Sequence, residues 1–535
     1  MTVEVPLVEG SYVKYEPEKK NPVDENSVSQ NIYVNPAFLK ASDNNPGTEL
    51  LPLKSLLAAA NIVNKNIQNN IGTRVILYPG IYRESIEIIN KVKENAPVIF
   101  EAKEAGSVII SGSDLWQNWQ QYPANKNIYT HSWPYDWGVA YNPWPDRIEI
   151  SEIARRKEII FINGKLLRQK LSLNELSPGS FYVSEETDTA FIYPPLETDV
   201  ENSQIEVGTR NRLIFTKGLN NLVLRGLKFQ HSNDYRREAV AILRGKNVLV
   251  ENCKFLWNNS DGLTIAQSEN ITVRKVTANH NGIRGMSANR LQNAYYEDVE
   301  SSYNNWRGDW GGFYSWDPGQ KFLFTRNLTF RRYKAVGNMA AGLWLDTDNS
   351  GVWIDDSLIC DNFHTGLYIE ASHHILVTNS KICHNRANPE SRYHHPGILG
   401  STSSDVTLEN NVICGNDRSQ IKVQVVKPYG GRVIPNWETD KEYALTSQQW
   451  VLKNNIIVGE KADQMLIFFE PNGQGFIDNL LSDGNIWYNP ENRQVFQVGV
   501  RKRNREDFNK WQKLTGQEQK SVFASPGQNY SCGES

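Results

Sequence analysis

Two short stretches of the sequence end in carboxylates after closely similar apolar runs. The stretch GLWLDTDN contains Asp346 and Asp348, and the stretch GLYIEAS contains Glu370. The alternation of leucine or isoleucine with other residues in each run is typical of a β-strand with one buried side. In such a strand Leu345 points inward and Asp346 points outward. The sequence therefore predicts two outward-facing acids at equivalent positions of two similar strands.

Asparagines recur after short β-like runs such as NCKFLWN, SLICDN and NVICGN. They are Asn258, Asn281, Asn304, Asn338, Asn362, Asn385 and Asn416, at spacings of 23, 23, 34, 24, 23 and 31. The segments between strands are too short for helical crossovers, and a β-rich period near 23 residues indicates a parallel β-helix with one coil per repeat. We expect the asparagines to stack as a ladder inside a turn.

Three cysteines share another register of this repeat. Cys360, Cys383 and Cys414 each precede a ladder asparagine by two residues, and none of the five cysteines shows CxxC spacing. We interpret the three as a buried stack of small apolar residues, in preference to a disulfide or a metal site.

The repeat places the two acids close to each other. Asp346 and Glu370 share one register on adjacent coils, and neighbouring strands lie about 4.8 Å apart, so the carboxylates should lie roughly 5 Å apart. That separation is expected in a retaining glycosidase. Two interacting carboxylates titrate together, which yields one ionised nucleophile and one protonated acid. The alternative is an acidic pair on a solvated face, but like charges in register repel and the neighbouring rings favour a chemical role.

Further residues are expected around the acids. The predicted outward row is Ala266, Asn289, Trp316, Asp346, Glu370, Ser401 and Gln424, and the parallel row is Thr264, Ser287, Tyr314, Trp344, Tyr368, Leu399 and Lys422. The expected substrate-binding residues are Asn289, Trp316, Trp344, Tyr368 and Gln424, with Arg307, Trp310, His394 and His395 from loops that could overhang the row. Asp348 either belongs to the turn or binds a sugar hydroxyl. Aromatic walls with few polar groups suit sugars.

The rest of the chain divides by pattern. Residues 1–30 read as an irregular arm, 31–111 as the solenoid start with a capping helix, 112–208 as an inserted β-rich domain, 209–500 as the main solenoid, and 501–535 as a C-terminal cap and tail. The buried side of the capping helix is expected to comprise Leu53, Leu56, Leu57, Ala60 and Val63. The fold class is therefore all-β, a parallel β-helix solenoid with a sandwich-like insertion.

Composition and charge bear on whether the protein binds nucleic acid or a membrane. The 535 residues carry a formal net charge of −3, which gives no argument for nucleic acid. No apolar run is long enough to span a membrane, and the first residues lack the apolar core of a signal peptide. The sequence as it stands indicates a cytoplasmic protein, or an extracellular one if a leader has been removed. Oligomeric state is not indicated.

Several stretches carry a family resemblance. They are SDNNPGTELLPLKSLLAA with ILYPGIYRESI, RRKEIIFINGKLLRQ followed by NLVLRGLKFQHS, and GLWLD with IEASHH in the next coil. The chain resembles pectate-lyase-like right-handed parallel β-helix proteins. More narrowly, it is similar to the β-helical glycoside hydrolases typified by bacterial β-xylosidases. This resemblance implies that Asp346 is the nucleophile and Glu370 the acid/base, with an oligosaccharide or polysaccharide as substrate and no cofactor.

Two other functions fit the same fold. In a polysaccharide lyase, Asp346, Asp348 and Glu370 would hold Ca²⁺ against a uronate, and Lys422 or Arg307 would remove a proton. The single basic residue in the predicted rows argues against that anionic substrate. The third possibility is a glycan-binding β-helix without catalysis, because fold alone does not decide function.

Overall fold

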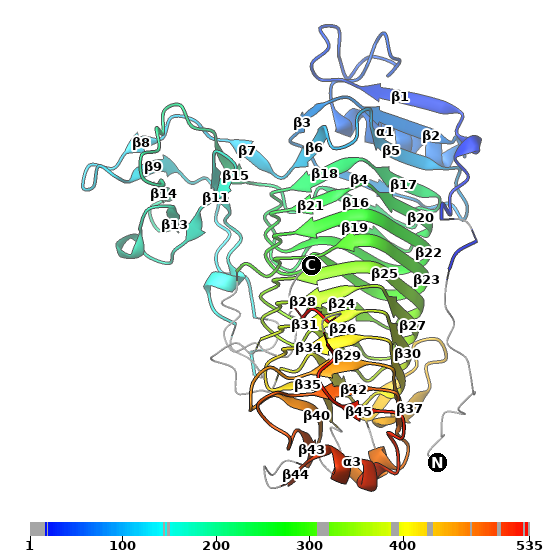
Figure 1. Ribbon diagram of the computed structural model, residues 1–535. Helices are drawn as coiled ribbons and strands as arrows, with labels where there is room; N and C mark the ends of the chain where they lie inside the picture. Colours follow the sequence, from blue (N-terminus) through cyan, green and yellow to red (C-terminus); the bar gives the residue numbers. More distant parts are fainter. Residues whose placement is uncertain are drawn as a thin grey trace.

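The computed structural model describes residues 16–18, 20–142, 145–146, 150–307, 320–386, 395–424, 432–470, 473–499, 504–527 and 530–532. Its largest element is a solenoid of parallel strands stacked coil upon coil (Figure 1). Each coil contributes to three faces, so the predicted parallel β-helix is confirmed.

The first face carries the acid pair. It comprises β4 (Ile86–Ile89), β16 (Ile214–Lys217), β19 (Glu238–Leu243), the first parts of β22 (Asp261–Asn279) and β23 (Met286–Glu300), β24 (Lys321–Leu323), β26 (Leu343–Asp346), β29 (Leu367–Glu370), β32 (Ile398–Ser401), β35 (Ser419–Gln424), β40 (Met465–Phe469) and β43 (Phe496–Val498), to which β44 (Arg505–Glu506) adds in the antiparallel sense.

The second face is built from neighbouring segments of the same coils. It comprises β1 (Gln30–Val34), β2 (Thr73–Leu77), β5 (Val98–Ala102), β17 (Leu222–Arg225), β20 (Lys246–Glu251), the middle of β22 and β23, the first part of β25 (Arg326–Val336), β27 (Ser350–Asp355), β30 (His373–Thr378), β33 (Ser404–Glu409), β38 (Gln448–Lys453) and β41 (Leu481–Asp483).

The third face closes each coil. It comprises β3 (Gly80–Tyr82), β6 (Val108–Ser111), β18 (Leu227–Gln230), β21 (Lys254–Leu256), the ends of β22, β23 and β25, β28 (Leu358–Cys360), β31 (Lys381–Cys383), β34 (Val412–Cys414), β39 (Ile456–Val458), β42 (Ile486–Tyr488) and β45 (Val522–Phe523).

The asparagine ladder is confirmed. Asn281 accepts hydrogen bonds at Oδ1 from the backbone and side-chain nitrogens of Asn258, at 3.2 and 2.9 Å. The same pairing repeats from coil to coil as far as Asn416, and all seven side chains are fully buried. Each amide satisfies a backbone donor that would otherwise be orphaned inside the turn. The ladder thus fixes the register that aligns the first-face strands.

A β-rich domain is inserted between β6 and β16 and lies beside the solenoid (Figure 1). One sheet has the order β11 (Lys165–Leu166), β10 (Ile160–Ile162), β15 (Ile205–Gly208) and β7 (Ser113–Leu115). The other has the order β12 (Arg168–Gln169), β13 (Ser180–Ser184), β14 (Thr189–Tyr193), β9 (Tyr129–Ser132) and β8 (Gln120–Gln121). Short helical turns are η2 (Ile153–Arg155) and η3 (Leu173–Glu175). Its own core includes Trp133 and Phe181, which agrees with the predicted insertion.

A helix covers each end of the solenoid. The helix α1 (Leu56–Gln68) is capped by Ser55, whose hydroxyl accepts from the Ala58 amide, and it buries Leu56 and Val63. Leu57 was expected on that buried side, but its side chain is half exposed. At the other end α3 (Phe508–Thr515) buries Trp511 against Phe496. A short helix, α2 (Gly473–Ile477), lies between them in sequence, and no helix among the described residues could cross a membrane.

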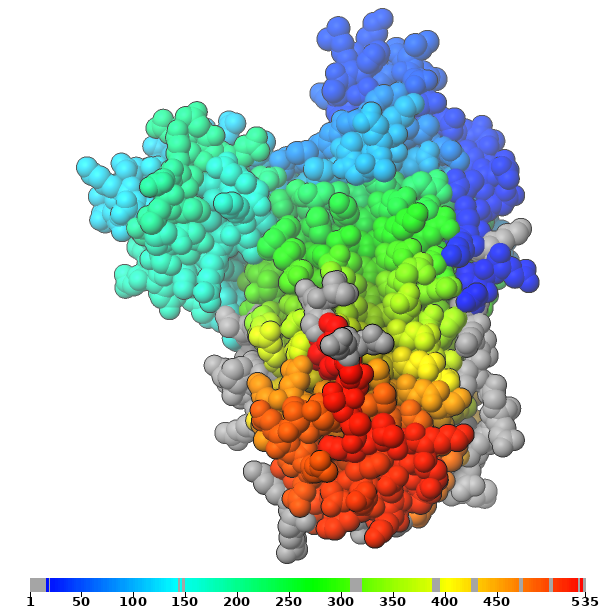
Figure 2. Space-filling model, in the orientation of Figure 1, coloured from blue at the N-terminus to red at the C-terminus, as the bar shows by residue number. Residues whose placement is uncertain are grey.

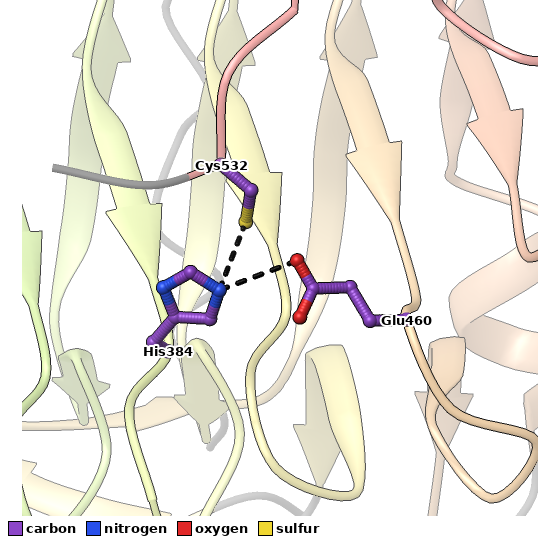
Figure 3. Close-up of side chains that lie close together, drawn as sticks. All are labelled: His384, Glu460 and Cys532. Atoms are coloured by element: carbon purple, nitrogen blue, oxygen red, sulfur yellow. Dashed lines mark hydrogen bonds and ion pairs between the residues drawn. The ribbon is translucent and has the colours of Figure 1, made fainter. Parts of the chain in front are cut away.

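The C-terminal tail returns over the solenoid. After β45 it runs back across earlier coils (red in Figure 2), and its described end, Cys532, forms a disulfide with Cys414. Cys360 and Cys383, stacked on adjacent strands, form a second disulfide. The predicted stack of unbonded cysteines was therefore wrong. Stacking in register brings two Cα atoms to 4.5 Å, which is within reach of a disulfide, and only the folded tail could supply Cys532. Figure 3 shows the end of this tail beside His384.

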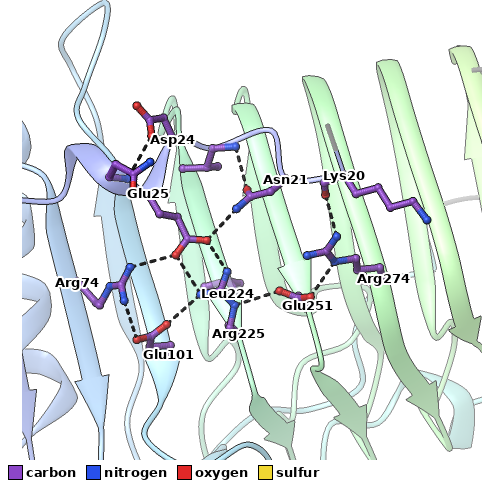
Figure 4. A network of polar contacts seen from close by, with 12 residues as sticks. Lys20, Asn21, Asp24, Glu25, Arg74, Glu101, Leu224, Arg225, Glu251 and Arg274 are labelled. Carbon is purple, nitrogen blue, oxygen red and sulfur yellow. Dashed lines mark hydrogen bonds and ion pairs between the residues drawn. The ribbon is translucent and has the colours of Figure 1, made fainter. Parts of the chain in front are cut away.

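The N-terminal arm is tied to the second face by ion pairs (Figure 4). It includes the 3₁₀ turn η1 (Glu25–Ser27). The Glu25 carboxylate lies between Arg74 and Arg225, at 3.1 Å from a nitrogen of each. Lys20 reaches Glu297 at 2.9 Å. Because these partners belong to different coils, the arm bridges them as an external strap.

Candidate active site

The two acids predicted from the repeat are paired in the structure. Asp346 ends β26, Glu370 ends β29, and the two residues are partners in the parallel register. The leucines that alternate with them, Leu343 and Leu345, lie in the solenoid core. Both carboxylates therefore project outward from neighbouring strands of the first face, which lie about 4.8 Å apart.

Asp346 is largely buried and receives two donors. The Lys321 ammonium lies 2.7 Å from its Oδ2, and the Thr347 hydroxyl donates to Oδ1 at 2.8 Å. Lys321 is itself largely buried and lies 3.9 Å from the centre of the Trp344 ring. The ion pair and the hydrogen bond hold the Asp346 carboxylate in a fixed position.

Glu370 has contrasting surroundings. Burial, together with the charge of Asp346, raises the pKa of its carboxyl to about 7, while Arg432 and Lys321 oppose the shift. The Arg432 guanidinium donates to Oε1 at 2.8 Å, and the Trp344 indole donates to Oε2 at 3.2 Å. At neutral pH a large fraction of Glu370 is therefore protonated beside Asp346, and the arrangement provides an acid and a base in adjacent coils.

The aromatic residues of the parallel row lie beside Glu370. Trp344 and Tyr368 are stacked with ring centres 4.9 Å apart, and with Leu399 they form a small buried cluster. The Tyr368 hydroxyl bonds to both Glu370 and Ser401, and burial together with the nearby acids raises its pKa well above the usual range. Both rings were predicted to bind substrate. The structure instead buries them, where they desolvate and orient Glu370.

The predicted rows are correct except at one coil. Asn289 pairs with Leu323, and Leu323 pairs with Asp346, so Leu323 occupies the position assigned to Trp316. In the parallel row Lys321 replaces Tyr314. The sequence alignment placed the strand inside the insertion that follows Asn304, whereas the strand is the KFL segment after it.

Asp348 belongs to the scaffold of the site. Its side chain is fully buried and accepts from Tyr443 Oη at 2.6 Å, Arg326 Nη2 at 2.9 Å and the Trp437 amide at 3.1 Å. Tyr443 and Trp437 lie in the hairpin formed by β36 (Arg432–Pro435) and β37 (Glu442–Leu445). Of the two alternatives for Asp348, a turn residue or a sugar-binding residue, the structure shows the first: Asp348 lies in the bend after β26 and holds this hairpin.

The hairpin delivers Arg432 to the acid pair. Its Ile434 and Leu445 pack on Ala371, the residue that follows Glu370. Arg432 is the first residue of β36, and its side chain is half exposed. Its guanidinium donates a hydrogen bond to the Glu370 carboxyl. No pattern in the sequence indicates this contact, because Arg432 lies in an insertion 62 residues after Glu370.

Arg307 lies in a different place from the one expected. Its fully buried guanidinium donates to Asn259 Oδ1 at 2.6 Å and to the backbone oxygens of Ile153 and Glu158 at 2.7 and 2.9 Å. Burial lowers the pKa of Arg307 to about 10. Because Ile153 and Glu158 belong to the inserted domain, Arg307 joins that domain to the solenoid and does not overhang the acids.

The remaining candidates divide into three groups. Asn289 and Gln424 lie in the acid row, two coils to either side of the pair, and Gln424 donates to Ser401 Oγ at 3.3 Å. His395 is buried in a turn, with its ring centre 3.9 Å from that of His364. The positions of Trp310, Trp316 and His394 lie outside the described residues.

The three acids considered as calcium ligands contact other groups of the protein. The Asp348 carboxylate accepts hydrogen bonds from Arg326, Tyr443 and Trp437. The Asp346 carboxylate forms an ion pair with Lys321. The proposed lyase bases are also engaged: Lys422 lies 3.4 Å from Glu470, and Arg307 holds the inserted domain. The first-face site holds more cations than the sequence indicated, but Lys321 and Arg432 are bound to the acids themselves.

Comparisons with known proteins agree with this architecture. No curated protein sequence is significantly similar to the chain. Among solved structures, XylC in complex with xylose aligns with a TM-score of 0.67 at 13% identity, covering 88% of this chain and 86% of that one. A structure described as a glycoside hydrolase aligns at 0.50 and 10% identity, covering 87% and 97%. At such identities the likeness concerns the fold.

A family model adds a sequence-level match. The model for the right-handed β-helix region matches residues 196–329 and 315–484, which together exceed half of the 535 residues. These residues include both strands of the acid pair. The chain belongs to the right-handed β-helix family.

Proposed function

We propose that this protein is a carbohydrate-active enzyme, a retaining glycoside hydrolase with Asp346 as nucleophile and Glu370 as acid/base. The observation that carries the proposal is the contrast between two acids paired in register. Lys321 and Thr347 contact Asp346, whereas burial raises the pKa of Glu370 to about 7. Retaining glycosidases need one ionised and one protonated carboxyl at close range.

The first half of the reaction uses both carboxyls at once. An Asp346 oxygen attacks the anomeric carbon while Glu370 gives its proton to the glycosidic oxygen, and the bond between that carbon and oxygen breaks. The products are a glycosyl ester on Asp346, a free alcohol and an ionised Glu370. Once the Asp346 charge is consumed in the ester, one of the causes that raise the Glu370 pKa disappears.

The second half reverses the roles. Ionised Glu370 removes a proton from water, the water oxygen attacks the anomeric carbon, and Asp346 leaves as a carboxylate. Arg432 can stabilise the ionised Glu370 between the two halves, since its guanidinium already donates to Oε1. Two inversions at the anomeric carbon leave its configuration unchanged.

The comparisons support a sugar substrate. The solved structures with the same fold include XylC with xylose and a glycoside hydrolase, and both cover most of this chain. We therefore propose an oligosaccharide or polysaccharide of plant or microbial origin, with xylose-containing glycosides as the first class to test.

The proposal is tested by a substrate screen with isosteric variants. Aryl glycosides and polysaccharides are assayed with wild type, Asp346→Asn, Glu370→Gln and the control Glu409→Gln, whose acid forms a surface ion pair with Lys453 on the second face. We expect hydrolysis by wild type and the control, and a loss of about 10³-fold or more in both site variants. Full activity in either site variant contradicts the assignment.

Two further measurements define the mechanism. Proton NMR of the first-formed sugar should show retained anomeric configuration, and a 2-deoxy-2-fluoro glycoside should leave a covalent label on Asp346 that mass spectrometry detects. Inverted configuration excludes the double displacement. An unsaturated product that absorbs in the ultraviolet and requires calcium would instead identify a lyase.

A further inference from the structure

A second cluster of reactive side chains lies where the C-terminal tail ends. His384 follows β31 on the third face, Glu460 follows β39, and Cys532 reaches them from the tail (Figure 3). His384 Nε2 lies 3.4 Å from Cys532 Sγ and 3.2 Å from Glu460 Oε1. All three ligand atoms lie within 4.8 Å of one another. None of these residues belongs to the acid-pair site.

The two separations measured from His384 Nε2 fit a zinc coordination shell. Zinc bonds are about 2.0 Å to nitrogen and oxygen and 2.3 Å to sulfur, so tetrahedral ligand atoms lie about 3.3 to 3.8 Å apart. The separations of 3.4 and 3.2 Å from His384 Nε2 fall close to this range. A mixed set of sulfur, imidazole and carboxylate donors suits zinc better than calcium or magnesium.

A fourth donor stands next to the third. Cys414 is bonded to Cys532 through sulfur, so reducing that bond leaves two thiols at the same place. Cys414 is fully buried at the end of β34, which keeps its sulfur fixed relative to His384. Two cysteines, one histidine and one glutamate complete a closed four-coordinate site of the structural kind.

Gly415 clears the space that the cluster occupies. A Cβ atom at this position would lie 2.4 Å from His384 Cδ2, 2.6 Å from Nε2 and 2.8 Å from Glu460 Oε2. Any side chain here would push the two ligands apart. The backbone is thus shaped for the close approach of His384 and Glu460.

We propose that Cys414, Cys532, His384 and Glu460 form a zinc site when the Cys414–Cys532 disulfide is reduced. A dithiol or phosphine reductant breaks the S–S bond and is itself oxidised, leaving two thiols. Zn²⁺ then binds both sulfurs as thiolates, which releases two protons, together with the His384 imidazole and the Glu460 carboxylate.

The disulfide and the zinc ion cannot be present at the same time, but each holds the C-terminal tail in place. Each fastens the tail to β34, three coils before β45, where the tail begins. Oxidised protein holds the tail by the S–S bond, and reduced protein holds it by the metal. Only reduced, metal-free protein releases the tail.

The test uses the full-length protein with Co²⁺ as a visible probe and Zn²⁺ as its competitor. After reduction with a phosphine and removal of metal, we expect one Co²⁺ per chain, with thiolate charge-transfer absorption, and displacement by one Zn²⁺. Oxidised protein should bind neither ion at this site. A reduced protein that takes up no metal overturns the proposal.

Matched variants locate the metal. His384→Asn and Glu460→Gln should weaken Zn²⁺ binding at least about tenfold, and Cys532→Ser should remove one thiolate contribution. His280→Asn is the control, because His280 holds the equivalent position before a ladder asparagine, also at positive φ. Cys360→Ser with Cys383→Ser tests the other thiols. Unchanged binding in both His384→Asn and Cys532→Ser, or binding lost only with Cys360 and Cys383, refutes this site.

Discussion

Arg432 Nη1 lies 2.8 Å from Glu370 Oε1, although the two residues belong to different parts of the fold, a peripheral hairpin and a solenoid strand. The contact opposes the effect of burial, which raises the Glu370 pKa to about 7. Lys321 opposes it from the other side, across Asp346. The proton on Glu370 is therefore set by charges that the strand itself does not carry.

The pH dependence of activity should report this balance. Glu370 must be protonated for the first step, so wild-type kcat/KM should fall above a pH of about 7. Arg432→Met removes a cause that lowers the Glu370 pKa, so the basic limb should move to higher pH. Arg432→Lys keeps the charge and should leave the limb nearer its wild-type position. A basic limb that stays in place in Arg432→Met contradicts the assignment of Glu370 as the acid.

Glu370 should reduce stability at alkaline pH. Its folded-state pKa of about 7 lies above the ordinary 4.5, so the folded state binds the proton more tightly than the unfolded state. Stability therefore falls as pH rises from about 4.5 to about 7. Glu370→Gln does not titrate, and at pH 8 it should gain on the order of 3 kcal/mol in unfolding free energy over wild type, with little difference at pH 4.

Urea denaturation at the two pH values measures this effect. Glu409→Gln serves as the control, because its acid is paired with Lys453 at the surface and lies outside the site. A Glu370→Gln variant that is less stable than wild type at pH 8 would show that the ionised carboxylate stabilises the folded state, which contradicts the prediction.

Tyr443 should influence the position of Arg432, because both residues belong to the hairpin that Asp348 holds. Its hydroxyl donates to the buried Asp348 carboxylate at 2.6 Å, and Tyr443→Phe leaves one acceptor of a charged group unsatisfied. We expect a loss of about 1–3 kcal/mol in stability. If the hairpin loosens, the basic limb of the pH profile should shift in the same direction as in Arg432→Met. A profile identical to wild type would separate the hairpin anchor from the chemistry.

Replacing Arg307 should affect the stability of the fold and not the activity of the acid pair. Arg307→Met leaves Asn259 Oδ1 and the Ile153 and Glu158 oxygens without a buried donor, so unfolding free energy should fall by about 3–5 kcal/mol. Below the unfolding transition kcat/KM should change less than threefold, because the residue is remote from the acids in its contacts. Loss of activity with intact stability would return Arg307 to the substrate site.

The Cys414–Cys532 disulfide should stabilise the solenoid through the chain it closes. The two cysteines are 118 residues apart, and removing such a cross-link costs about 2–5 kcal/mol. Cys414→Ser, Cys532→Ser and the double variant should lose similar amounts in oxidising, metal-free buffer, because each breaks the same bond. Additive losses would show that the two sulfurs are not joined.

Sequence alone determined the repeating architecture of this protein. The alternation of Leu343 and Leu345 with outward residues, and the period set by the ladder asparagines, predicted the solenoid, its register and the pairing of Asp346 with Glu370. These features are periodic, so each coil repeats the same information and local pattern is enough.

The tertiary structure decided which contacts the insertions and the tail make with the solenoid. Lys321 reaches Asp346 because the strand resumes after an insertion, and Arg432 reaches Glu370 from a hairpin. Cys532 bonds to Cys414 only because the tail folds back over the solenoid. Arg307 donates a hydrogen bond to the backbone of the inserted domain. Insertions interrupt the period, and their contacts depend on three-dimensional packing, which no local spacing encodes.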